Sequence, residues 1–257
     1  MEKVGPFDSD IDPTVGVEHA EAIASAIASS SLSSKEGGPL LIYASPFLRT
    51  THTACIISRR IPSSTVRIEE GLYEWMTPSL LVEPNGIRTQ PRSLDQLVQN
   101  FPHASIDPTY QSVNPVMEEI EEENNDKPMF SVPTLVPEGA PHFEETEEAL
   151  LERCATTLER ILAQVGDRDI ALVSHAPCDQ AFALYLEGKG VANTELKAWP
   201  LGGITCFSRT ITVGETTTWT MDQYGDTTHM PGPYQAGLKE WSLPCVAGAT
   251  YIYSSTN

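Results

Sequence analysis

The chain carries the segment LLIYASPFLRTTHT at residues 40–53, where an apolar run passes through a Ser-Pro turn into a polar, Arg-containing stretch. An apolar run of this length is typical of a strand that is covered on both faces. The Ser-Pro pair suits the start of a helix, because proline is tolerated in a first helical turn. The segment therefore predicts a buried strand over 40–44 and a helix over 47–59, with Arg49 in the first turn of that helix.

A second segment, DIALVSHA at residues 169–176, has the same arrangement. It predicts a buried strand over 169–173, and His175 follows directly after that strand. Ligands of open parallel sheets bind beyond the carboxyl ends of the strands. We therefore expect Arg49 and His175 at the same edge of one sheet, although they lie far apart in the sequence.

Helical and strand patterns alternate along the rest of the chain. Helical patterns occupy residues 15–29, 93–100, 144–165 and 181–187. Strand patterns occupy residues 65–69, 205–213 and 216–221, the last two as a hairpin, and the tail from 227 is mostly irregular. This order predicts an α/β fold with a mostly parallel sheet and helices on both faces. We expect one domain over residues 1–257, interrupted by a Pro-rich and acidic insertion at about 76–143.

The composition limits the class of protein. A length of 257 residues with 40% hydrophobic residues is ordinary for one α/β domain. The formal net charge of -19 disfavours nucleic acid and anionic membrane as partners. The five cysteines form no Cys-x-x-Cys pair, and neither a signal peptide nor a membrane-spanning apolar run is recognisable. We expect reduced thiols and a cytoplasmic location, with the nucleus as the alternative.

Arg49 is the first candidate for a ligand contact. Its planar guanidinium matches the oxygens of a phosphate, and a helix N-terminus favours a bound anion. The alternative is a surface arginine that pairs with one of the many carboxylates of this acidic chain.

His175 is the second candidate. A protonated imidazole can bind a phosphoryl oxygen and stabilise charge in a transition state. The alternative is a buried histidine whose ring bonds a backbone carbonyl. Cys178 follows three residues later, but no group is evident that would orient it, so a Cys-His catalytic pair is disfavoured.

Residues 69–75, EEGLYEW, bring three carboxylates to the end of another predicted strand. A glutamate held against tryptophan can have a raised pKa and act as a general acid, which makes Glu74 a candidate proton donor. The alternative is a solvated acidic turn. The remaining histidines lack metal-ligand spacing, and there is no Gly-rich phosphate loop or dinucleotide fingerprint, so we predict neither a metal site nor a cofactor.

In their order along the chain, these segments resemble the histidine phosphatase superfamily, also called phosphoglycerate mutase-like. The similar segments are Asp12-Pro13, residues 43–53 with Ser-Pro-x-x-Arg, residues 69–75 and residues 173–176. Residues 69–75 and Gly-Glu-Thr at 214–216 are most similar to the phosphatase domain of the suppressor of T-cell receptor signalling proteins. The resemblance covers nearly the whole chain except residues 84–143.

The resemblance implies hydrolysis of a phosphomonoester through a phosphohistidine, without a cofactor. It implies that Arg49 and His175 bind the phosphate, that His175 also takes part in catalysis, and that Glu74 is the proton donor. The implied substrate is a phosphoprotein or a phosphorylated small molecule, and a homodimer is compatible with the resemblance. A mutase is the weaker interpretation, because the Gly-Leu-aromatic-Glu-Trp pattern is that of phosphatases.

The nucleophile of the superfamily is a different histidine, in an Arg-His-Gly segment at the end of the first, central strand. No Arg-His-Gly occurs in this chain, and the segment would precede Asp12. We therefore expect an N-terminally truncated domain that lacks the first central strand and is inactive as given. The alternative is a catalytically inactive domain that binds phosphate or another protein.

Overall fold

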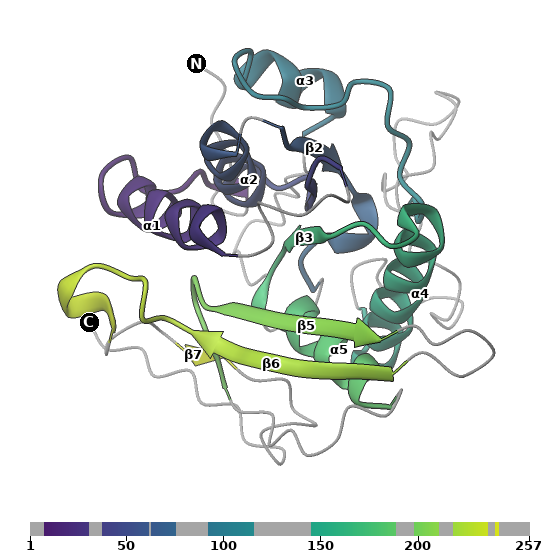
Figure 1. Cartoon of the computed structure of the whole chain (residues 1–257). Helices are drawn as coiled ribbons and strands as arrows, with labels where there is room; N and C mark the ends of the chain where they lie inside the picture. Colours follow the sequence, from purple (N-terminus) through teal and green to yellow (C-terminus); the bar gives the residue numbers. More distant parts are fainter. Residues whose placement is uncertain are drawn as a thin grey trace, which may run out of the picture.

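A parallel sheet of three strands forms the centre of the protein (Figure 1). The computed structural model describes residues 8–30, 38–61, 63–75, 92–115, 145–188, 198–210, 218–235 and 240–241. The strands of the sheet are β1 (Leu41–Ala44), β2 (Thr65–Ile68) and β3 (Ile170–Val173), in the order β2-β1-β3. In this register Tyr43 of β1 lies between Arg67 and Leu172, so all three strands end at the same edge.

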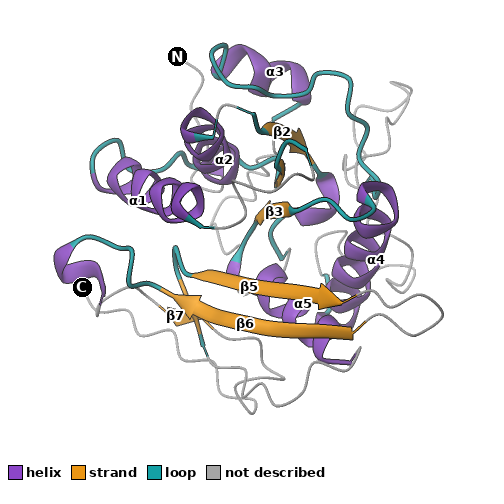
Figure 2. Ribbon diagram, viewed as in Figure 1, coloured by secondary structure: helices purple, strands orange, loops and turns teal. Residues whose placement is uncertain are grey.

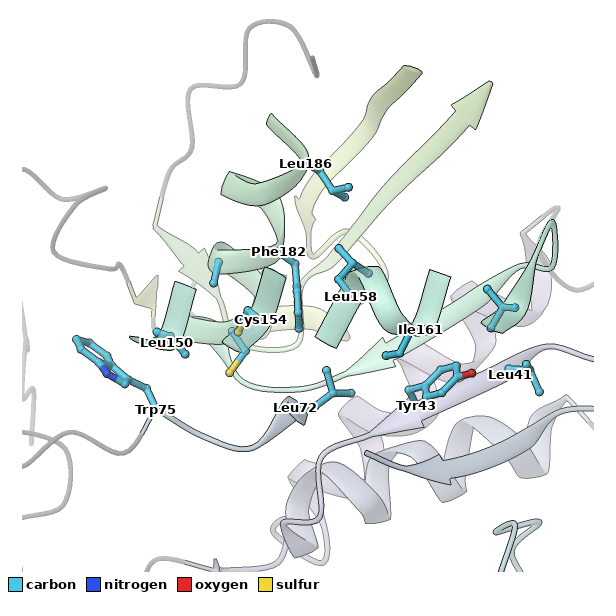
Figure 3. Packing of buried hydrophobic residues seen from close by; sticks show 13 residues of the cluster. Leu41, Tyr43, Leu72, Trp75, Leu150, Cys154, Leu158, Ile161, Phe182 and Leu186 are labelled. Carbon is cyan, nitrogen blue, oxygen red and sulfur yellow. The ribbon is translucent and has the colours of Figure 1, made fainter. Parts of the chain in front are cut away.

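Helices cover both faces of the sheet (Figure 2). They are α1 (Val15–Ser29), α2 (Leu48–Arg60), α4 (Glu147–Val165) and α5 (Ala176–Gly188). Successive side chains of a strand point to opposite faces. Accordingly Leu41 and Tyr43 pack with α4 and α5, whereas Ile42 and Ala44 pack with α1 and α2. Figure 3 shows Tyr43 near Ile161 of α4 in the first of these clusters. The predicted fold class is confirmed.

Helix α5 begins earlier than the sequence predicts. The prediction placed its start at residue 181, but the helix begins at Ala176 and includes Pro177 in its first turn. Proline is accommodated there because the first residues of a helix have no intrahelical acceptor for their N–H groups. The first turn is closed by the N–H of Asp179, which donates to the carbonyl of His175 at 2.9 Å. His175 therefore lies directly before the helix.

Strand β3 is less covered than the sequence predicts. All four residues of β1 are buried, whereas all four residues of β3 are only half-buried. The reason is topological, because among the described residues β3 lies at the edge of the sheet and pairs with β1 alone. The prediction of a buried strand was therefore correct for β1 and wrong for β3.

Part of the predicted insertion packs on the domain. Helix α3 (Leu94–Asn100), which was predicted over 93–100, begins with a capping box of Ser93 and Gln96, and its Leu97 is fully buried. Further on, Ile106 forms a parallel bridge with Val66 of β2. Residues 92–115 thus extend the layer beside β2, and the acidic block at 118–126 lies outside the described residues.

The C-terminal part contains short antiparallel pairs. The predicted hairpin is present as β5 (Ile204–Thr210) and β6 (Thr218–Asp226), although its turn lies outside the described residues. Within the tail that was predicted to be irregular, β7 (Glu240–Trp241) pairs with β4 (Trp199–Pro200), and η4 (Gly232–Gln235) is a short 3-10 helix. The helices described in the structure include none that is both long enough and apolar enough to cross a membrane.

Candidate functional site

Arg49, Glu74 and His175 meet at the carboxyl edge of the parallel sheet. Nη2 of Arg49 lies 3.2 Å from Oε2 of Glu74 and 3.1 Å from Nδ1 of His175. The same Nδ1 lies 3.2 Å from Oε2 of Glu74. The structure therefore brings together three residues that the sequence nominated separately, from α2, from the segment after β2 and from the segment after β3.

The turn between β1 and α2 fixes the position of Arg49. The hydroxyls of Thr50 and Thr51 both donate to the carbonyl of Ser45, each at 3.0 Å. These bonds tie the first turn of α2 back to the end of β1, so Arg49 projects from a rigid corner. The alternative drawn from the sequence, pairing with a carboxylate, is also observed, since that carboxylate is Glu74.

His175 is held at both ring nitrogens by side chains. Its Nε2 lies 2.8 Å from the hydroxyl of Ser45, and its ring meets the ring of Phe47 edge to face at 5.3 Å between centroids. Its side chain is only 3% exposed. The alternative of a ring bonded to a backbone carbonyl therefore does not describe this histidine. Ser45 was missed as a site residue, although its place at the end of β1 beside Pro46 was a usable signal.

The pKa of Glu74 is shifted in the direction opposite to the prediction. Burial disfavours the carboxylate, but attraction to His175 and Arg49 and the N–H of Trp75 at 2.9 Å outweigh it and lower the pKa to about 2. The prediction of a raised pKa depended on contact with the Trp75 ring, but Nε1 of that ring donates to the carbonyl of Glu145. With these contacts, Glu74 is an ionised carboxylate at neutral pH.

The pKa of His175 is lower than its ordinary value. Burial is the main cause, and the nearby Arg49 and Arg153 add to it, while Glu74 opposes it. His175 is therefore neutral at neutral pH, and the positive charge of the site lies on Arg49. Its Nδ1 can accept from Arg49 or donate to Glu74, depending on the tautomer.

Replacing Glu74 by glutamine is expected to lower the pKa of His175 further. The carboxylate of Glu74 stabilises the imidazolium, and the neutral amide would not. An NMR titration of the His175 ring in the E74Q variant checks this. The matched control is E70Q, which removes a neighbouring carboxylate that is not among the groups that shift the pKa of His175. An unchanged or higher pKa of His175 in E74Q would contradict the geometry described above.

An internal carboxylate occupies the start of α2. Oδ1 of Asp8 accepts from the N–H of Leu48 at 2.6 Å, and Oδ2 accepts from Nη1 of Arg92 at 2.6 Å. Asp8 is 3% exposed, and burial raises its pKa. The sequence predicts a bound anion at this helix terminus, but in the structure Asp8 accepts from its first N–H group, and the half-buried Arg49 lies beside it.

Cys178 does not act as a partner of His175. Its thiol donates to the carbonyl of Tyr73 at 3.0 Å, and burial raises its pKa, so it stays protonated. The described cysteines, Cys55, Cys154, Cys178 and Cys206, are all free thiols, while Cys245 lies outside the described residues. Over the described ranges, no cluster of three or more His, Cys, Asp or Glu side chains is arranged to hold a metal ion.

Comparison with known proteins found similarity in solved structures. No family model and no curated protein matches the chain. An ecdysone phosphate phosphatase from Bombix mori, solved with tungstate, aligns with 72% of this chain at 16% identity and a TM-score of 0.46, and this chain covers 60% of its length. A mycobacterial glucosyl-3-phosphoglycerate phosphatase aligns with 86% of this chain and 90% of its own at 20% identity and a TM-score of 0.48. A phosphoserine phosphatase from Entamoeba histolytica aligns with 89% of this chain and 90% of its own at 18% identity and a TM-score of 0.43.

Proposed function

We propose that this chain carries the phosphate-binding half of a histidine phosphatase site and that the complete site hydrolyses phosphomonoesters. The observation that carries the proposal is the meeting of Arg49, His175 and Glu74 within 3.2 Å at the edge where the parallel strands end. A guanidinium beside an imidazole offers several donors to the oxygens of one phosphoryl group. The side chain of Arg49 is 27% exposed, so an anion can reach it from solvent.

The three residues have distinct roles in the proposed reaction. Arg49 and His175 bind phosphoryl oxygens and stabilise the charge of the transition state. Glu74 donates a proton to the leaving oxygen of the ester. A bound phosphate would interact with the positive charge of Arg49 and so weaken its attraction for the Glu74 carboxylate. It would also place a second negative charge beside that carboxylate. Both effects raise the pKa of Glu74. Glu74 would therefore become a proton donor only when substrate is bound.

We further propose that the nucleophile is a histidine in a segment N-terminal to this chain. Its nitrogen would attack phosphorus, the ester oxygen would leave with the proton of Glu74, and water would then hydrolyse the phosphohistidine. The order of the motifs supports this, because Arg49, Glu74 and His175 match the later positions of the superfamily pattern.

Hydrolysis of an aryl phosphate tests the proposal. We expect no turnover by the chain as given. We expect turnover when the protein is extended by the in-frame upstream coding sequence and that sequence supplies an Arg-His-Gly segment, and loss of turnover in H175A of the extended protein. Activity of the chain as given that depends on His175, or a stop codon directly upstream of Met1, would refute an upstream nucleophile.

A non-catalytic domain that binds a phosphorylated partner is the second candidate. The ionised state of Glu74 favours it, because a carboxylate without a proton cannot protonate a leaving group. If this candidate is correct, tungstate will bind both to the 257-residue chain and to the protein extended by the upstream sequence. Neither protein will hydrolyse a phosphate ester. The cytoplasmic location and the homodimer stay predictions.

A further inference from the structure

The segment that carries Glu74 is held by side chains rather than by regular backbone pairing. The segment consists of the short helix η3 (Glu70–Leu72) and residues 73–75 after it, and it runs past α4 and α5 without joining a strand or an α-helix. Buried carbonyls of such a segment need donors from elsewhere. The four shortest of these bonds come from Arg153 to Gly71 at 2.8 Å and to Tyr73 at 3.1 Å, from Ser174 to Leu72 at 2.9 Å, and from Cys178 to Tyr73 at 3.0 Å.

Arg153 makes two of these four bonds from a single nitrogen. It projects from the buried face of α4 and is 4% exposed. Its Nε and Nη2 donate to the two carboxylate oxygens of Glu145 at 2.6 and 2.9 Å, and its guanidinium carbon lies 3.8 Å from the centre of the Tyr73 ring. The fork of Arg153 therefore reaches Glu145, Gly71 and Tyr73 at once.

Glu145 holds the residue that follows Glu74. Its side chain is 1% exposed and pairs with Arg153, while its backbone carbonyl accepts from Nε1 of Trp75 at 2.8 Å. The residues directly before and after Glu74 are thus both fixed to this one ion pair. The packing is tight as well, because a Cβ atom on Gly71 would lie 2.7 Å from Cγ2 of Thr157 on α4.

We propose that Arg153, oriented by Glu145, is a positioning residue that directs Glu74 toward His175 and Arg49. The importance of this role for catalysis rests on the function proposed above. A buried ion pair is a poor source of stability, since removing two charges from water offsets much of their attraction. It does impose one geometry, because a planar fork satisfies several acceptors only in a single orientation.

Replacing Arg153 by lysine separates geometry from charge. Glu74, Arg49 and Arg153 are the charged groups that act on His175, and lysine keeps the charge of Arg153 while losing its fork. If Arg153 positions Glu74, R153K will weaken the contact between Glu74 and His175. The pKa of His175 will then fall, by a smaller shift than the one that E74Q produces.

NMR titration of His175 in four proteins tests the inference: the unaltered chain, R153K, E74Q and the double variant. We expect R153K to lower the pKa of His175 when Glu74 is present and to leave it unchanged in the E74Q background. R160K is the matched control, since Arg160 lies on the same helix and donates to the carbonyl of Val113 at 2.9 Å, outside the site. It should leave the titration of His175 unchanged.

Two results would overturn the inference. A lower melting temperature of R153K with an unchanged pKa of His175 would show a structural role only. An equal shift with and without Glu74 would show that Arg153 does not act through Glu74. If R153K fails to fold, E145Q can be used in its place, because E145Q keeps Arg153 but weakens the contact that orients it. The pKa of His175 is then compared with the melting temperature, and again with and without Glu74. Tungstate binding to the unaltered chain tests the proposed function separately, so failure of one proposal is distinguishable from failure of the other.

Discussion

Replacing Arg49 by alanine is expected to weaken the binding of tungstate or inorganic phosphate by about 30-fold or more. Charge-assisted hydrogen bonds to an anion contribute about 2 kcal/mol or more, and about 1.4 kcal/mol corresponds to a factor of ten. Arg49 is the accessible cation of the site, while His175 beside it is neutral at neutral pH. Isothermal titration calorimetry of the chain and of R49A, at one fixed salt concentration, measures the difference.

The control removes the same charge from the same helix. Arg59 lies in the last turn of α2, and its side chain is 55% exposed beside Glu21. Arg59 lies at the opposite end of α2 from Arg49, and salt screens an exposed charge so far from the bound anion. R59A should therefore change the affinity for tungstate or phosphate by less than about 2-fold. Equal losses in R49A and R59A would mean that net charge, rather than a contact at Arg49, governs binding. Full affinity in R49A would remove Arg49 from the site.

The frame of the site was predictable because it depends on local sequence. An apolar run followed by Ser45 and Pro46 specifies a strand, a turn and a helix in succession, and β1 and α2 begin within one residue of the prediction. Once two such units lie in one parallel sheet, their strands end at the same edge. The meeting of Arg49 and His175 follows from that rule and needs no further information about the chain.

The electrostatics of the site were not predictable, because they depend on partners distant in sequence. Glu74 was assigned a raised pKa from its neighbour Trp75, but its actual contacts are Arg49 and His175, and they lower the pKa to about 2. The exposure of β3 likewise depends on the order of strands in the sheet, which local pattern does not specify. Arg153 did leave a signal, since it is a charged residue on the apolar face of a helix, between Leu150 and Cys154.

Glu69 is a carboxylate with five hydrogen-bond donors around it, and it ties two distant segments together. It lies at the end of β2 and is fully buried. Its oxygens accept hydrogen bonds from the N–H of Gly71 at 3.0 Å and from four groups of residues 110–114, which are the hydroxyls of Tyr110 and Ser112 and the N–H groups of Val113 and Asn114. Burial and the charge of Glu69 raise the pKa of Tyr110, which therefore stays protonated and donates.

Replacing Glu69 by alanine is therefore expected to lower the free energy of unfolding by about 4 kcal/mol, because each buried donor left without an acceptor costs about 1–3 kcal/mol. For a chain of this size the melting temperature should fall by roughly 10 °C. Calorimetry of E69A, E69Q and the exposed control E148A checks this, and E148A should stay within about 0.5 kcal/mol of the parent. Glutamine keeps the volume of Glu69 but turns one acceptor into a donor, so E69Q should show most of the loss. A stable E69Q beside an unstable E69A would assign the effect to a cavity instead, and the segment that leads to Glu74 would then be held by packing rather than by this carboxylate.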